Sequence, residues 1–244
     1  MRLDKYLADC GAGTRSEIKK IIKSGGVQVL GVEKPKADLQ IDPETAGVIL
    51  WGKKLVYRKF IYLMMNKPQG YISATWDKKL PTVLDLVPEE YQHFEPFPVG
   101  RLDIDTEGLC LITNDGQLAH RLLSPVSHIP KIYTAQINMP ATKEDIEAFK
   151  KGITLDDGYL CKSALLETTD DETSVCVTIT EGKFHQVKRM FEACGKKVLY
   201  LKRIAMNQLV LDENLELGEV RELTDEEILL LDRKKEEDDL WKQE

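Results

Sequence analysis

The first fifty residues carry apolar positions with helical spacing. Apolar residues recur three or four positions apart, as on one face of a helix, at Leu3 and Leu7 and then at Ile18, Ile21 and Ile22. Glycines separate these two predicted helices, and Thr14 precedes Glu17 by three residues, which is the spacing of a capping box. Strands are predicted at 27–30 and 48–51.

From Phe60 onwards, short apolar runs broken by Pro and Gly replace that spacing. Runs rich in β-branched and aromatic residues predict strands at 62–65, 110–112, 132–137, 175–179 and 198–201. Helices are predicted at 82–86, 116–123, 143–151 and 185–194, with a last one after Thr224. Thr142 and Gly152 frame the third of these as cap and stop. Because the order is mixed, the expected fold class is α+β, with a mainly antiparallel sheet and flanking helices.

These patterns divide the chain into three segments. Residues 1–58 form a small unit of helices and strands, with the basic stretch 53–59 as its linker. Residues 59–232 form the larger α+β domain, and 233–244 is a tail dense in charge. We find no internal repeat and no linker rich in Ser and Gly.

The net charge of −7 is unevenly distributed along the chain. Residues 212–244 hold 14 acids and 5 bases, whereas 183–203 hold seven bases and one acid. Arg15, Lys19 and Lys23 recur every four residues and form a basic ridge on the second helix. Local patches of this kind, rather than the total charge, determine whether phosphates bind. The alternative is an ordinary solvated helix face.

Several classes of protein are disfavoured by the composition. The five cysteines are scattered and contain no Cys-x-x-Cys pair, which supports neither a zinc site nor a disulfide framework and favours reduced thiols in the cytoplasm. No run approaches the roughly 18 apolar residues of a membrane span, and the charged first twenty residues do not match a secretory signal.

The segment Gly100-Arg101-Leu102-Asp103-Ile104-Asp105-Thr106-Glu107-Gly108-Leu109 places an acid directly after an Arg-Leu pair, between two glycines. On its own it is equally typical of an acidic turn between two strands. It resembles the signature of the RNA pseudouridine synthases, in the branch that modifies ribosomal RNA and carries a small RNA-binding domain in front. The resemblance implies that Asp103 acts on the sugar of a uridine, by attack at the anomeric carbon or by proton abstraction from the neighbouring carbon. It also implies that the reaction needs no cofactor and no metal.

Two further segments resemble motifs of that family. Lys131-Ile132-Tyr133 is similar to its Lys-x-Tyr motif, which implies that Tyr133 stacks on the target base; without the resemblance Tyr133 is typical of a core residue. Glu181 to Phe191 is similar to its third motif, which implies that Lys188 pairs with Asp103. On a helix, Lys188 lies about 110° from the centre of the apolar face and can reach a half-buried cleft. Arg189 lies nearly opposite that face and is expected to contact phosphate. The alternative is an amphipathic helix with a basic outer face.

Other residues carry weaker expectations. Leu201 matches a family aliphatic residue that packs on the uracil. Arg101 is expected to fill the space of an extruded nucleotide, or else to form a salt bridge with Asp105 or Glu107. Asn66-Lys67-Pro68-Gln69-Gly70 resembles the first family motif, with Lys67 as a phosphate contact, although a simple turn also explains it. His185 falls in a structural part of its motif and is left out of catalysis. Asp103 and Asp105 are also typical of a paired-carboxylate site, as in glycosidases, or of a magnesium site, but a shared role of the two is not expected.

The N-terminal unit resembles the S4 RNA-binding domain over residues 1 to about 47. The resemblance is carried by 2–7, Thr14-Arg15-Ser16-Glu17 and 25–29, and it implies that the basic ridge lies against folded RNA. Leu123-Ser124-Pro125 through His128, leading into Lys131, is most similar to the subgroup that modifies 16S small-subunit ribosomal RNA.

The expected function is therefore the isomerisation of one uridine in 16S ribosomal RNA. The expected partner is ribosomal RNA in a small-subunit assembly intermediate, bound by a monomer without contact to a membrane. Three alternatives stay open: the same chemistry on 23S ribosomal RNA, a non-catalytic RNA-binding factor in ribosome assembly, and a glycosidase-like hydrolase. The set of Asp103, Tyr133 and a basic partner disfavours the second, and the basic N-terminal unit disfavours the third.

Overall fold

The computed structural model describes residues 1–232, which form two compact units. The first unit comprises residues 1–61 together with 88–96, and the second comprises 62–87 together with the chain from 97 onwards. The charged tail expected at 233–244 lies outside the described residues. Within residues 1–232, no helix combines the length and the apolar character needed to cross a membrane.

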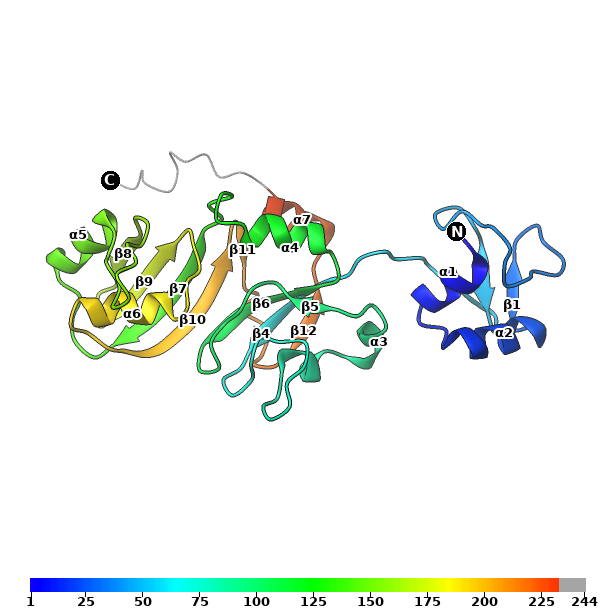
Figure 1. Ribbon diagram of the computed structural model, residues 1–244, viewed down its shortest axis with the longest axis horizontal. Helices are drawn as coiled ribbons and strands as arrows, with labels where there is room; N and C mark the ends of the chain where they lie inside the picture. Colours follow the sequence, from blue (N-terminus) through cyan, green and yellow to red (C-terminus); the bar gives the residue numbers. More distant parts are fainter. Residues whose placement is uncertain (233–244) are drawn as a thin grey trace. The chain divides into compact units, whose positions relative to one another are not determined.

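The first unit packs its first two helices on a small antiparallel sheet (Figure 1). Its elements are α1 (Leu3–Asp9), α2 (Arg15–Lys23), β1 (Val27–Val29), β2 (Val48–Leu50), β3 (Lys53–Lys54) and α3 (Glu89–Gln92). Residues 1–61 hold one three-stranded sheet, in the order β1-β2-β3. The predicted capping box is present, with Thr14 accepting from the backbone of Glu17 and Glu17 accepting from the backbone of Thr14.

One part of this unit differs from expectation. Lys53 and Lys54, expected in a linker, form a strand that pairs with Leu50 and Ile49. The turn that joins the two strands has positive φ at Trp51 (49°) and Gly52 (81°). Positive φ at both central residues is the conformation of a two-residue hairpin turn that matches the twist of paired strands.

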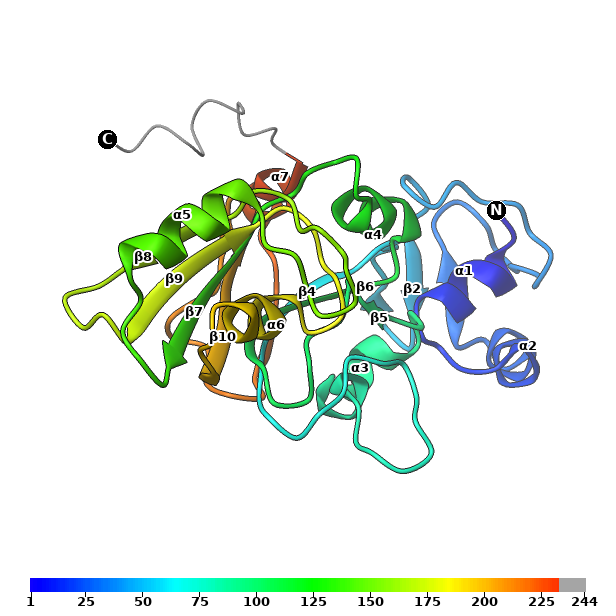
Figure 2. The same cartoon turned by 60° about the vertical axis from the view of Figure 1, so that its left-hand side comes forward.

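The second unit is built on one mixed sheet (Figures 1 and 2). Its strands are β4 (Tyr62–Lys67), β5 (Phe97–Pro98), β6 (Glu107–Thr113), β7 (Lys131–Ile137), β8 (Leu165–Thr168), β9 (Ser174–Ile179), β10 (Val198–Met206), β11 (Leu209–Val210) and β12 (Val220–Glu222). Across residues 62–222 the main order is β12-β4-β6-β10-β7-β9-β8, with β5 beside β6 and β11 beside β10. Neighbours are antiparallel except for β10 and β6, which run parallel. The predicted α+β class, with a mainly antiparallel sheet, is confirmed.

The helices of this unit follow the predicted caps in most places. They are η1 (Val83–Leu86), α4 (Gly116–Leu123), α5 (Lys143–Lys151), α6 (Gln186–Ala193) and α7 (Asp225–Asp232). Thr142 and Asp145 form a capping box at the start of α5, and Gly152 ends the helix with a φ of 91°. The helix predicted at 82–86 is a single 3-10 turn.

The two faces of the sheet serve different purposes. On one face, Met64, Leu109 and Leu111 join buried residues of α4 and α7 in the main apolar core. Strand alternation turns Met65, Lys67 and Cys110 to the opposite face. Figure 2 shows α6 in front of β7 and β10, with α5 lying along β8 and β9. Phe149 of α5 and Phe191 of α6 pack together, with ring centroids 5.0 Å apart. The second face therefore has room for polar side chains beside α6.

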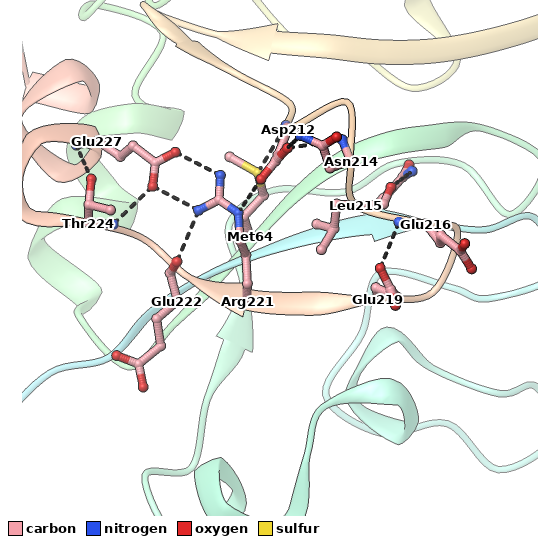
Figure 3. A network of polar contacts seen from close by, with 11 residues as sticks. Met64, Asp212, Asn214, Leu215, Glu216, Glu219, Arg221, Glu222, Thr224 and Glu227 are labelled. Carbon is pink, nitrogen blue, oxygen red and sulfur yellow. Dashed lines mark hydrogen bonds and ion pairs between the residues drawn. The ribbon is translucent and has the colours of Figure 1, made fainter.

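A polar network closes the C-terminal part of the described chain (Figure 3). Arg221 of β12 donates from Nη1 and Nη2 to the two carboxylate oxygens of Glu227, at 2.8 Å each. Its Nε donates to Asp212, at 2.7 Å. Thr224 and Glu227 cap α7 through reciprocal backbone contacts of 2.9 and 3.2 Å. One guanidinium thus joins β12, the segment after β11 and the first turn of α7.

Replacing Arg221 with Met is expected to lower the free energy of unfolding by about 1–2 kcal/mol at neutral pH, because three charged hydrogen bonds of partly exposed groups are lost.

Hydrogen bonds from Arg221 hold the pKa of Glu227 below its ordinary 4.5. The backbone of Asn214, and then Arg221, hold the pKa of Asp212 below 3.8. A lowered carboxyl pKa stabilises the fold above the ordinary value, and this contribution is lost as the pH falls through the lowered one. The difference in stability between the two proteins should therefore shrink below about pH 4.5. Denaturant unfolding at several pH values measures it, and an unchanged difference at low pH would exclude this role for the carboxylates.

Candidate active site

A row of four paired residues crosses the sheet beside α6. Lys67 pairs with Gly108, Gly108 with Arg203, and Arg203 with Tyr133, on strands β4, β6, β10 and β7. Residues directly opposite one another on neighbouring strands point to the same face of a sheet. Lys67, Arg203 and Tyr133 therefore share the face that is turned away from the main apolar core.

Gly108 allows the middle strands of this row to approach closely. Its φ is 100°, and a Cβ built there would lie 2.2 Å from the carbonyl oxygen of Arg203. A side chain at this position would push β6 away from β10. The second glycine of the Gly100–Leu109 motif is thus required by the parallel pairing of these two strands.

Asp103 lies in a tight turn just before β6. The backbone N–H of Thr106 donates to the carbonyl oxygen of Asp103, at 3.1 Å. Ser73, which is buried, binds the backbone of Leu102 twice, accepting from its N–H at 2.9 Å and donating to its carbonyl at 3.0 Å. The N–H of Gly70 donates to the carbonyl of Ile104, at 2.8 Å. The segment after β4 therefore fixes the backbone on both sides of Asp103.

The side chain of Lys67 holds this turn through hydrogen bonds to backbone carbonyls. Its side chain is fully buried, and Nζ donates to the carbonyl oxygens of Asp103 (3.0 Å), Thr106 (2.9 Å) and Pro68 (3.0 Å). Burial lowers the pKa of this ammonium to about 8. The expected phosphate contact of Lys67 is therefore wrong for this arrangement, because its donors are used inside the protein. Its position opposite Gly108 turns it inward, under the turn that carries Asp103.

Replacing Lys67 with Met is expected to misplace Asp103. The variant keeps a similar length but leaves three buried carbonyls without this donor, which should cost about 2–4 kcal/mol of stability. Displacement of a reacting group by about 1 Å can lower a rate by about 100-fold, so the kcat of a reaction in which Asp103 takes part should fall by 10- to 100-fold. Thermal unfolding and turnover of the same preparation measure both effects. A variant of lowered stability with unchanged kcat would limit Lys67 to folding.

Lys188 brings two carboxylates together at this turn. Its Nζ lies 3.0 Å from Asp103 and 2.5 Å from Asp105. Burial acts to lower the pKa of Lys188, but hydrogen bonds to Asp105 and Asp103 outweigh it and hold that pKa above its ordinary value. The same hydrogen bond outweighs burial at Asp105 and lowers the pKa of that carboxyl. The structure thus places Lys188 against Asp103, as the spacing of the helix allowed.

Asp103 and Asp105 share one partner, an arrangement that was not expected. The segment is a turn rather than a strand, as the hydrogen bond from Thr106 to Asp103 shows. A turn brings residues two apart towards one partner, here Lys188. Asp103 is the more enclosed of the pair, with 22% of its side chain exposed against 62% for Asp105. The imidazole of His185 also lies close, with Nε2 3.6 Å from an oxygen of the Asp103 carboxylate.

A buried network holds the start of α6, and with it Lys188. Glu181 accepts from Gln186 (2.9 Å), from Tyr159 (2.7 Å) and from the backbone of Lys162 (2.9 Å). Gln186 also accepts from the backbone of Lys183, at 2.9 Å. His185 precedes the helix in a left-handed conformation, with a φ of 49°. Sequence reasoning missed Glu181 and Gln186 as positioning residues, although both lie in the quoted motif.

Arg189 does not project towards solvent as expected. Its guanidinium pairs with Asp156 and Asp157, and only 15% of the side chain is exposed. Both acids belong to the segment between α5 and β8, whose position the sequence pattern did not reveal. The guanidinium expected at phosphate is thus engaged with two exposed carboxylates of this chain, which fixes the outer side of α6.

Tyr133 and Leu201 lie close together on the site face. Leu201 pairs with Ala135 and Arg203 with Tyr133, which makes Tyr133 and Leu201 diagonal neighbours. Both are buried, at 8% and 4% exposure.

Arg203, which pairs with Tyr133, was not singled out from the sequence. Its Nε donates to the carbonyl of Leu109 at 2.8 Å, and within residues 1–232 its Nη2 has no hydrogen-bond partner. The site face thus carries one buried donor that the described protein does not use.

Arg101 and the basic ridge are on the surface. Arg101 is exposed, and within residues 1–232 it forms no ion pair with Asp105 or Glu107, since Asp105 binds Lys188 and Glu107 accepts from the Tyr200 hydroxyl at 2.6 Å. The salt-bridge alternative for Arg101 is therefore not observed. In the first unit, the ridge residues Arg15, Lys19 and Lys23 are all exposed on α2.

Comparison with known proteins identifies the family. Residues 61–193 match the family model for RNA pseudouridylate synthase. An uncharacterized RNA pseudouridine synthase of Bacillus subtilis is 51% identical over 95% of this chain and 98% of its own. The ribosomal small subunit pseudouridine synthase A of Vibrio cholerae is 42% identical over 93% of this chain and 98% of its own. A crystal structure of a pseudouridylate synthase superposes with a TM-score of 0.67 at 37% identity, covering 95% of this chain and 99% of that one.

Proposed function

The chain belongs to the RNA pseudouridine synthase family and is an isomerase of uridine in RNA; on that basis we propose that its substrate is one uridine of 16S ribosomal RNA and that Asp103 is the catalytic carboxylate. The reaction breaks the bond between N1 of uracil and C1′ of ribose. After the uracil turns over, a bond forms between C5 and C1′, the proton on C5 is released, and N1 takes up a proton, so that the product is an isomer of the substrate. No electron or group is gained or lost, so the residues of the site suffice.

The single observation that carries this proposal is the contact between Lys188 and Asp103. Lys188 Nζ lies 3.0 Å from the Asp103 carboxylate, so the lysine holds the carboxylate in place and sets a positive charge beside it. A carboxylate fixed in this way can act on the ribose of a bound uridine. Lys67 and Ser73 hold the backbone of the turn, so the carboxylate is positioned before the RNA arrives.

We assign the opposite wall of the site to the base. The ring of Tyr133 stacks on the uracil, and Leu201 packs beside it, which holds the detached base while it turns. Arg203 offers its unused Nη2 to a carbonyl of that base. Arg101, exposed beside Asp103, fills the space that the extruded nucleotide leaves.

The choice of 16S ribosomal RNA rests on resemblance in sequence. Relatives named as ribosomal small subunit pseudouridine synthase A align over nearly their whole length, and the segment from Leu123 to Tyr133 is typical of that subgroup. The test is to incubate the protein with unmodified 16S and 23S transcripts and to map pseudouridine by carbodiimide-blocked primer extension. One new stop in 16S RNA is expected. A stop in 23S RNA alone would reject the target while leaving the chemistry intact.

We further propose that the first unit is an S4-like RNA-binding domain whose ridge contacts phosphates. Changing Arg15, Lys19 and Lys23 together to Gln should weaken RNA binding by roughly 10-fold or more at moderate salt and reduce the salt dependence of the affinity, because each phosphate contact releases counterions. Filter binding over a range of salt concentrations measures both. Changing Lys34, Lys36 and Lys53 to Gln removes the same charge elsewhere in the unit and serves as the control. Equal effects of the two triple variants would show a general charge effect rather than a ridge.

A further inference from the structure

A loop of the second unit that the sequence motifs do not cover is fastened to the turn of Asp103. We call residues 70–82, between β4 and η1, the Trp76 loop. Near its start, Ser73 binds both the N–H and the carbonyl of Leu102, and Gly70 donates to Ile104. Trp76 follows Ser73 by three residues and so lies within about 10 Å of that contact. Whatever the tip of this loop binds is therefore a close neighbour of the reacting uridine.

The two ends of the loop are bridged to each other, and hydrogen bonds hold the backbone at its tip. Ile72 and Thr82 form a parallel bridge, with the N–H of Ile72 donating to Pro81 and the N–H of Val83 donating to Ile72, both at 3.0 Å. At the tip, a carboxylate oxygen of Asp77 accepts from the backbone N–H groups of Lys79 (2.8 Å) and Leu80 (3.0 Å). The loop thus holds one conformation with little further ordering needed when a ligand binds.

The tip presents an aromatic ring with two cations. Residues 75–81 are all exposed, and 75% of Trp76 lies in solvent. The indole face is therefore open to a ligand from solvent. Lys78 and Lys79 are exposed beside it, and the one acid of the tip, Asp77, is engaged with the backbone. An aromatic face flanked by lysines suits an unpaired nucleobase, with phosphates on either side.

We propose that Trp76 stacks on an unpaired base of the substrate RNA next to the target uridine, with Lys78 and Lys79 against the adjoining phosphates. The proposal rests on an RNA substrate but not on which RNA that is. Stacking on this ring holds the strand on one side of the site while the uridine is extruded. Trp76 is then a positioning residue, which should govern affinity more than turnover.

The test compares Trp76→Leu, Trp76→Phe and the control Leu229→Ala, which trims another exposed apolar side chain, on α7. The RNA is whichever ribosomal transcript the unaltered protein modifies, or a short oligouridylate if it modifies neither. Trp76→Leu should raise Kd and KM by about 10-fold, since loss of one stacked base costs that order of affinity. Its kcat at saturating RNA should stay within about twofold, and Trp76→Phe should retain most of the affinity. Equal melting temperatures of all four proteins establish that Trp76 is not needed for folding.

The outcomes separate this inference from the proposed function. Unchanged Kd and KM for Trp76→Leu, in a protein that forms pseudouridine, would overturn the stacking role alone. So would a Trp76→Phe variant as weak as Trp76→Leu, because a phenyl ring also stacks. Weaker binding by Trp76→Leu, in a protein that modifies neither ribosomal RNA, would uphold the stacking role and reject the proposed substrate.

Discussion

Replacing Asp103 with Asn is expected to abolish pseudouridine formation while leaving the fold and the RNA affinity intact. The amide has the shape of the carboxylate and can still lie near Lys188, but it is neither a nucleophile nor a base. Removal of the reacting group from an otherwise complete site lowers turnover by at least about 10⁴-fold. Single-turnover product formation, filter binding and thermal unfolding of one preparation measure the three quantities.

Asp105 provides the matched control for that variant. It binds the same Lys188 nitrogen from two residues away, but 62% of its side chain is exposed. Because an exposed ion pair contributes about 1 kcal/mol or less, Asp105→Asn should lose less than about 10-fold in activity. If Asp105→Asn were the inactive variant and Asp103→Asn retained turnover, the roles of the two carboxylates would have to be exchanged.

Lys188→Met is expected to have the second largest effect. The change leaves the carboxylates of Asp103 and Asp105 close together without the ammonium that both contact. Truncating one partner of an enclosed, hydrogen-bonded charge pair costs about 2–5 kcal/mol. If that loss falls on the reacting carboxylate, kcat should drop by about 100-fold or more.

Two further variants make the Lys188 result specific. Lys188→Arg keeps the positive charge and a donor to both carboxylates, so it should retain activity within about 10-fold. Lys197→Met removes an exposed charge from the same basic segment and should leave kcat unchanged. A Lys188→Arg protein as inactive as Lys188→Met would mean that the exact geometry of the lysine, rather than its charge, supports the reaction.

The local sequence pattern predicted the helices and strands well, but it predicted the contacts between distant residues poorly. Strand alternation and the capping residues Thr14, Thr142 and Gly152 act within a few residues, and the structure has them where the pattern indicated. The strand at Lys53–Lys54 was missed because its pairing depends on the turn at Trp51 and Gly52, and not on apolar residues of its own.

The site residues show the same limit. Helical spacing was enough to place Lys188 beside the apolar face of its helix, since that position depends on one helix alone. The partners of Lys67 and Arg189 are distant in the sequence: Lys67 reaches the turn at Asp103, and Arg189 meets Asp156 and Asp157. A sequence pattern shows that such side chains are cationic but not which oxygen atoms the fold brings to them. Both were therefore expected at phosphates, whereas Lys67 is buried against backbone carbonyls and Arg189 pairs with two surface carboxylates.

The most direct test of Asp103 as the catalytic carboxylate of a cofactor-free isomerase is tritium release. Transcripts of 16S ribosomal RNA labelled at C5 of uridine are incubated with the protein alone, since the label leaves when C5 becomes bonded to C1′. The unaltered protein should release about one tritium per transcript, and Asp103→Asn none. No release from 16S or 23S RNA, whether naked or in partly assembled subunits, or equal release by the Asp103→Asn protein, would contradict that assignment.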